Sequence, residues 1–136
     1  MRVMSTHSVT IDLVTERPSD GAFVLVLVEE GPWADADVPA QLRRIQERLY
    51  DCVDAAVDGH LAQRYPDSRG KPAVIRLDCY DIPDSPIRKF VTGFAESIRD
   101  SQEVQRDLLA QGFVKSLDFE YNSRRIPGGS ASRNGC

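Results

Sequence analysis

Hydrophobic and polar residues alternate near the start of the chain, where Val9, Ile11 and Leu13 are separated by polar residues. A period of two predicts a strand with one buried face. A turn follows at residues 16–21, which contain a proline and an Asp-Gly pair. Residues 23–28 are then apolar at every position. We expect them to form a second strand, apolar on both sides, that pairs with the first as a hairpin.

The next segment has the period of an amphipathic helix. Asp35 and Asp37 are candidate N-caps for it, and Gly59 is expected as its left-handed C-cap. The apolar positions recur every three or four residues, at Leu42, Ile45, Leu49, Val53 and Ala56. The arginines between them are expected to pair with Glu47 and Asp51 on an ordinary solvated face.

A strand and a second helix follow. Residues 73–80 alternate again, with Ile75, Leu77 and Cys79 on one side. Ser85 is the expected N-cap of a helix whose apolar stripe is Ile87, Phe90, Val91, Phe94 and Ile98. Asp100 with Glu103 resembles a capping box, which predicts a break and a short third helix that ends at Gly112. Residues 115–121 alternate as a last strand.

This order of elements, β-β-α-β-α-(α)-β, predicts an α+β fold. Strands joined through helices pair in parallel by right-handed connections, which puts the helices on one face. We therefore expect a two-layer α/β sandwich with a four-stranded mixed sheet. A single domain is expected at residues 9–122, with a flexible arm at residues 1–8 and a flexible tail at residues 123–136.

Composition narrows the class of protein. The 136 residues are 41% hydrophobic and 28% charged, as in ordinary folded domains, and the net charge is −4. That balance argues against binding of nucleic acid or of an anionic membrane as the main role, because both need clustered positive charge. Three cysteines, Cys52, Cys79 and Cys136, are an odd number without C-x-x-C spacing, which favours reduced thiols. With no signal-like apolar start, a cytoplasmic protein is expected.

Several short stretches within residues 9–82 carry a resemblance to a known family. They are Val9-Thr10-Ile11-Asp12, Trp33, Gln41-Leu42, Gln46-Glu47, Tyr50, Gly59-His60-Leu61, Tyr65-Pro66, Gly70-Lys71 and Val74-Ile75-Arg76. Together they resemble an uncharacterised bacterial family of small α/β domains, catalogued only as a domain of unknown function. The resemblance implies a compact α/β domain and assigns no catalytic residue.

Acidic residues gather where two strands are expected to end. The second and third strands should point the same way, so the loops at residues 29–37 and 81–84 should share one edge of the sheet. We call this edge the acidic rim. Its candidate residues are Glu29, Glu30, Trp33, Asp35, Asp37, Asp81 and Asp84. Three interpretations stay open: a surface for a basic partner anchored by Trp33, a divalent-cation site, or acids that merely favour helix N-termini.

These patterns predict a non-catalytic protein–protein interaction module, for which an immunity-like role that neutralises a nuclease is one form. The alternative is a small metal-dependent enzyme or ligand binder that uses the same rim. A third hypothesis is nucleic-acid binding through the arginines of the tail. No catalytic residue, metal ligand or cofactor is assigned, and neither His7 nor His60 has zinc-ligand spacing. A homodimer is expected through the exposed sheet face or an edge strand, because the second strand is apolar on both sides.

Overall fold

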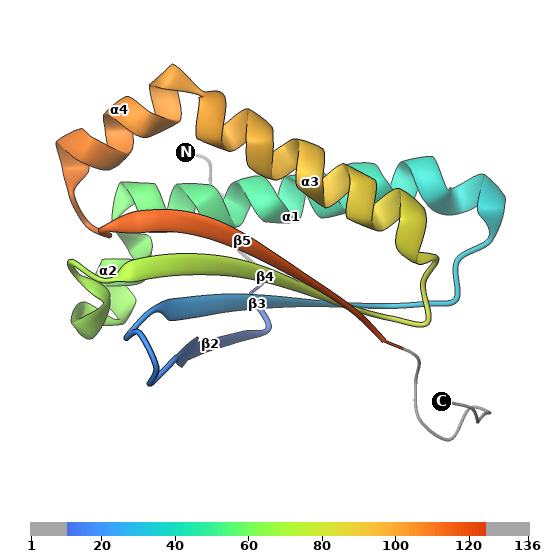
Figure 1. Cartoon of the computed structure of the whole chain (residues 1–136), viewed down its shortest axis with the longest axis horizontal. Helices are drawn as coiled ribbons and strands as arrows, with labels where there is room; N and C mark the ends of the chain where they lie inside the picture. Colours follow the sequence, from blue (N-terminus) through green and yellow to red (C-terminus); the bar gives the residue numbers. More distant parts are fainter. Residues whose placement is uncertain (1–10, 125–136) are drawn as a thin grey trace.

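A computed structural model describes residues 11–124 of the chain, arranged as a sheet covered by helices (Figure 1). The strands are β2 (Leu13–Glu16), β3 (Phe23–Glu30), β4 (Pro72–Tyr80) and β5 (Ser116–Arg124). The helices are α1 (Val38–Asp58), α2 (His60–Arg64), α3 (Asp84–Asp100) and α4 (Gln102–Gln111), with 3₁₀ turns η1 (Asp35–Asp37) and η2 (Pro66–Ser68). The expected α+β fold is confirmed.

The strands lie in the order in which the chain makes them. The sheet runs β2-β3-β4-β5, with β2 antiparallel to β3 and the other two pairings parallel. Both helical connections therefore step across the sheet in the same direction. Connections of one hand that step the same way place their helices on the same face. Helices α1, α3 and α4 indeed share one face of the sheet (Figure 1).

The main core fills the space between the sheet and this helical layer. From β3 it takes Phe23, Leu25 and Leu27, and from the next strand Ile75 and Leu77. The helices contribute the apolar stripes that their period predicts, which are Ile45, Leu49, Val53 and Ala56 in α1 and Ile87, Val91, Phe94 and Ile98 in α3. The two periods, two in strands and near 3.6 in helices, thus converge on one core.

The opposite side of β3 is buried as well. Val24 and Val26 are only 1% and 2% exposed and pack with Ala22 and Val74 in a second, separate cluster. The homodimer was expected through this face or an edge strand, because β3 is apolar on both sides. Val24 and Val26 do not form an accessible apolar stripe, because they are shielded from solvent. The homodimer itself stays a prediction.

Two expected helix boundaries are wrong, and the expected start of the first strand lies outside the described residues. The first described strand begins at Leu13, after Ile11 and Asp12. Helix α3 begins at Asp84 with Pro83 at the N-cap, so Ser85 is already helical. The cap of α4 is Ser101, whose Oγ accepts a hydrogen bond from the Val104 amide at 3.2 Å. The break between α3 and α4 was expected one residue earlier, at Asp100.

The last strand is longer than its apolar period indicates. Strand β5 continues to Arg124, two residues into the range expected as a tail. Its pairing with β4 explains this, since Ser123 lies opposite Cys79 and Arg124 opposite Tyr80. Residues 1–10 and 125–136, which include the expected arm and most of the tail, lie outside the described residues.

Gly59 ends α1 as expected, with a left-handed φ of 97°. A Cβ at this position would also lie 2.8 Å from Cζ of Phe113, closer than real Cβ contacts. Gly70 has a similar φ of 75°, yet nothing lies within 4 Å of its Cβ position. A comparison of Gly59 with Gly70 therefore separates the cost of a left-handed backbone from the cost of a collision with Phe113.

We expect Gly70→Ala to lower the free energy of unfolding by about 1 kcal/mol, the cost of a left-handed non-glycine residue. Gly59→Ala should cost about 1–3 kcal/mol more, because the methyl group collides with the Phe113 ring. Urea denaturation of both variants measures the two values. Equal losses at the two positions would contradict the packing contribution.

Candidate functional site

The acidic rim forms where β3 and β4 end side by side. Glu30 lies opposite Tyr80 in the register, and the Gly31 amide donates to the Tyr80 carbonyl at 2.8 Å. A Cβ at Gly31 would lie 2.2 Å from the Asp81 carbonyl oxygen, so only glycine lets the two loops approach this closely. The Asp81 amide donates to the carbonyl of Arg124 at 2.8 Å. Three segments of the chain therefore meet at this edge.

Between these segments lies a pocket of about 520 Å³, which we call the rim pocket. Its lining residues are Pro32, Trp33, Asp81, Ile82, Pro83, Asp84, Ser123 and Arg124. Trp33 is half-buried and packs against the main core, whereas Asp81 and Asp84 are exposed. The structure thus brings three of the seven expected residues to one pocket with an indole and two carboxylates.

The two carboxylates of the rim pocket differ in their surroundings. Arg88 donates twice to Asp84 at 3.1 Å, and Tyr121 Oη donates to it at 2.9 Å. These hydrogen bonds, that of Arg88 foremost, lower the pKa of Asp84. Asp81, by contrast, has no side-chain hydrogen bond or ion pair within residues 11–124. Its charge is the one left available to a ligand.

Tyr121 is held as a neutral donor at this site. Burial, before any other cause, raises its pKa to about 12, because a phenolate is poorly solvated there. The Arg88 guanidinium lies over its ring, 5.0 Å from the centroid. Tyr121 and Arg88 therefore fix the Asp84 carboxylate and leave it little freedom to bind elsewhere.

Glu30, Asp35 and Asp37 are exposed residues near the pocket in the sequence, but they do not line it. Asp35 and Asp37 form the 3₁₀ turn that leads into α1. Asp37 occupies the N-cap of α1, yet its side chain makes no capping hydrogen bond. Capping therefore does not account for its carboxylate, although the helix dipole still favours a negative charge there.

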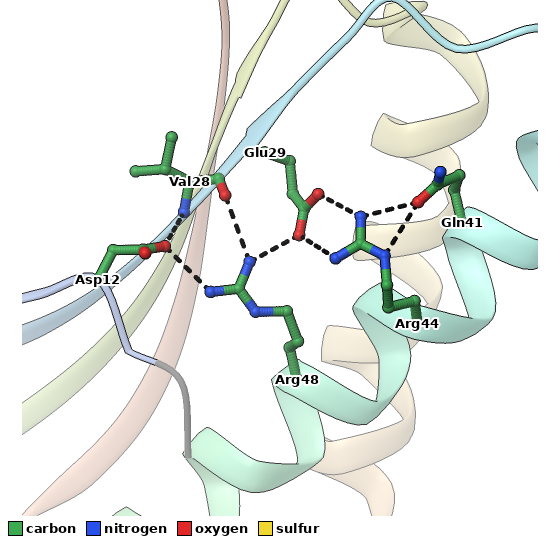
Figure 2. A network of polar contacts seen from close by, with 6 residues as sticks. All are labelled: Asp12, Val28, Glu29, Gln41, Arg44 and Arg48. Carbon is green, nitrogen blue, oxygen red and sulfur yellow. Dashed lines mark hydrogen bonds and ion pairs between the residues drawn. The ribbon is translucent and has the colours of Figure 1, made fainter. Parts of the chain in front are cut away.

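Glu29 is not part of the exposed rim, which corrects the expectation. It is only 4% exposed and points toward α1, where Arg44 and Arg48 donate to its carboxylate (Figure 2). The distance from Arg48 Nη1 to Glu29 Oε2 is 2.6 Å, and that from Arg44 Nη1 is 3.0 Å. The reason is strand alternation, because Glu29 follows Leu25 and Leu27 on the helix-facing side of β3.

The same network reaches the first residues that the structure describes. Arg48 also donates to Asp12 at 3.0 Å and to the Val28 carbonyl at 3.3 Å, and Asp12 accepts from the Val28 amide at 2.7 Å (Figure 2). Burial opposes the charge of Arg48, but the hydrogen bonds to Glu29 and Asp12 outweigh it and raise its pKa. Arg44 and Arg48 therefore form ion pairs with residues outside α1. The expectation was that they would pair with Glu47 and Asp51 of the same helix.

Other chemistry finds little support in the described residues. Within residues 11–124, no three His, Cys, Asp or Glu side chains are grouped so that they could hold a metal ion. Cys52 and Cys79 are buried, and burial raises the pKa of each thiol to about 12, which suppresses the nucleophilic thiolate. In the same part of the chain, every helix is too short or too polar to cross a membrane.

No protein-family model, no curated protein and no solved structure matches this chain. The resemblance of residues 9–82 to an uncharacterised bacterial family therefore stays a prediction. What the site does has to be inferred from its geometry and charge.

The ion pairs of Glu29 with Arg44 and Arg48 predict that substitutions of Glu29 and of its neighbour Glu30 differ greatly in their effect on stability. Glu29→Gln removes the charge that balances Arg48, so we expect a loss of about 3 kcal/mol in the free energy of unfolding. Glu30→Gln, one residue further along the same strand but exposed, should change it by less than about 0.5 kcal/mol. Urea denaturation of the two variants tests this, and similar stabilities would contradict a structural role for Glu29.

The two buried cysteines should resist alkylation in the native protein. At pH 8 a thiol with a pKa near 12 is thiolate in only about one molecule in ten thousand, so iodoacetamide should leave Cys52 and Cys79 unmodified. Peptide mass spectrometry before and after denaturation measures this. Rapid native labelling of either residue would show that its thiol is more accessible than the structure indicates.

Proposed function

We propose that this protein is a non-catalytic interaction module that captures a positively charged side chain of a basic protein partner in the rim pocket. The observation that carries this proposal is the placement of Trp33 and Asp81 on the same pocket. Trp33 offers an aromatic face, and Asp81 offers a carboxylate with no partner inside the described chain.

A lysine or arginine side chain suits each part of this lining. The face of an indole attracts a cation, by about 0.5–2 kcal/mol depending on exposure. An unpaired carboxylate nearby adds a charge-assisted hydrogen bond. Pro32, Ile82 and Pro83 supply apolar surface against which the methylene stem of the side chain can pack.

The charge around the pocket favours a basic partner over an acidic one. Five exposed carboxylates at or beside this edge outnumber the two arginines, Arg88 and Arg124. The carboxylates are Glu30, Asp35, Asp37, Asp81 and Asp84. Such a field speeds the encounter with a positively charged surface. Inhibition of a nuclease, whose phosphate-binding cleft is basic, is one role that this surface would serve.

Trp33 makes a direct test possible, because it is the only tryptophan of the chain. Titration with a hexa-arginine peptide at low ionic strength should change its fluorescence saturably, whereas hexa-glutamate should not. Asp81→Asn should weaken hexa-arginine binding about tenfold, the loss of one charge-assisted contact. The matched control is Asp58→Asn, an exposed carboxylate at the other end of α1, which should bind as the unchanged protein does.

Trp33→Ala separates binding from folding. We expect it to abolish hexa-arginine binding, measured by calorimetry. The free energy of unfolding should fall by less than the loss of about 3–5 kcal/mol that truncation of a fully buried aromatic residue causes. If Trp33→Ala is strongly destabilised but still binds the peptide, Trp33 is only a core residue and the proposal fails. Equal binding by Asp81→Asn and the unchanged protein would overturn it as well.

A further inference from the structure

A second pocket, of about 510 Å³, lies at the β2 edge of the sheet, where α1 gives way to α2. We call it the β2-edge pocket. Ala55 near the end of α1 and Leu61 of α2 are both buried and form apolar parts of its lining, with Val14 of β2 beside them. Trp33 precedes α1 and Ala55 lies near its end, so the two pockets occupy opposite ends of that helix.

The polar part of this lining comes from one turn of helix and the residue after it. His60 and Arg64 are four residues apart in α2, a spacing that puts both on the same side of a helix, and Tyr65 follows directly. Neither His60 nor Arg64 has a side-chain hydrogen bond or ion pair within residues 11–124. Both are exposed, so their donors are open to a ligand.

One carboxylate also lines the pocket, but its charge is already balanced. Asp12 accepts hydrogen bonds from Arg48 at 3.0 Å and from the Val28 amide at 2.7 Å (Figure 2). It therefore does not neutralise Arg64. The pocket is left with an apolar floor and a cationic side, the reverse of the rim pocket in charge.

We propose that the β2-edge pocket binds a small molecule with an apolar chain and a single carboxylate. The guanidinium of Arg64 forms paired hydrogen bonds with a carboxylate, and His60 and Tyr65 supply further donors. Val14, Ala55 and Leu61 receive the chain. The volume lies within the range of pockets that bury small ligands, about 300–1,000 Å³. One arginine beside one histidine matches a monoanion better than a doubly charged phosphate.

Octanoate, below its micellar concentration, is the probe, and amide chemical shifts of the full chain are the readout. Saturable shifts are expected at Val14, Leu61 and Arg64, with no change in the fluorescence of Trp33. Octanol carries the same chain without the charge, and acetate carries the charge without the chain. Neither should produce these shifts at the same concentration.

Two arginine variants complete the test. Arg64→Gln should weaken octanoate binding about tenfold, as loss of a charged hydrogen bond does. Arg106→Gln, an exposed arginine of α4 away from the pocket, should leave it unchanged. Equal binding of octanol and octanoate, shifts scattered over the surface, or normal affinity of Arg64→Gln would each overturn the proposal. None of these results depends on whether the rim pocket binds a basic partner.

Discussion

Strand β3 is buried on both of its faces, and the helical layer covers one of them. Leu25 and Leu27 face the helical layer, whereas Val24 and Val26 belong to the separate cluster on the other side. The helix-facing row ends in Glu29, so a carboxylate enters the interface between sheet and helix. A buried charge is tolerated only when it is paired and hydrogen-bonded. Arg44 and Arg48 meet that need, and they fix α1 along the strand; Asp12 ties the chain before β2 to the same point.

The rim pocket follows from the same arrangement. Because β3 and β4 are parallel and end in register, the loops that lead to α1 and α3 leave the sheet at one place. Gly31 and Asp81 touch through their backbones there, and β5 adds Arg124 to the same edge. Trp33 is then held between the core and solvent. The pocket is built from loops, but each loop is anchored at a strand end, which is where rigid scaffolds commonly position binding residues.

Much of this could be read from the sequence, since hydrophobic periods identify strands and helices and the order of elements limits the topology. The common edge for Trp33, Asp81 and Asp84 follows from two parallel strands. The place of Glu29 could also have been found, because its alternation with Leu27 points it at the helix. Local patterns do not show which side chains of different elements pair with one another. Arg48 lies on α1 and its partner Glu29 on β3, and Ser101 becomes a cap because α3 ends at Asp100.

The buried network also affects how the surface charge is to be judged. A net charge of −4 suggests a mildly acidic protein with its charges mixed. Yet Arg44 and Arg48 are engaged by Glu29 and Asp12, so these four charges largely cancel one another and contribute little to the field outside. Within residues 11–124 the acids beside Trp33, apart from Asp84, have no such partners, and Arg64 lines the pocket at the other end of α1. Because these four charges cancel, the charges that distinguish the ligands proposed for the two pockets are Asp81 in the rim pocket and Arg64 in the β2-edge pocket.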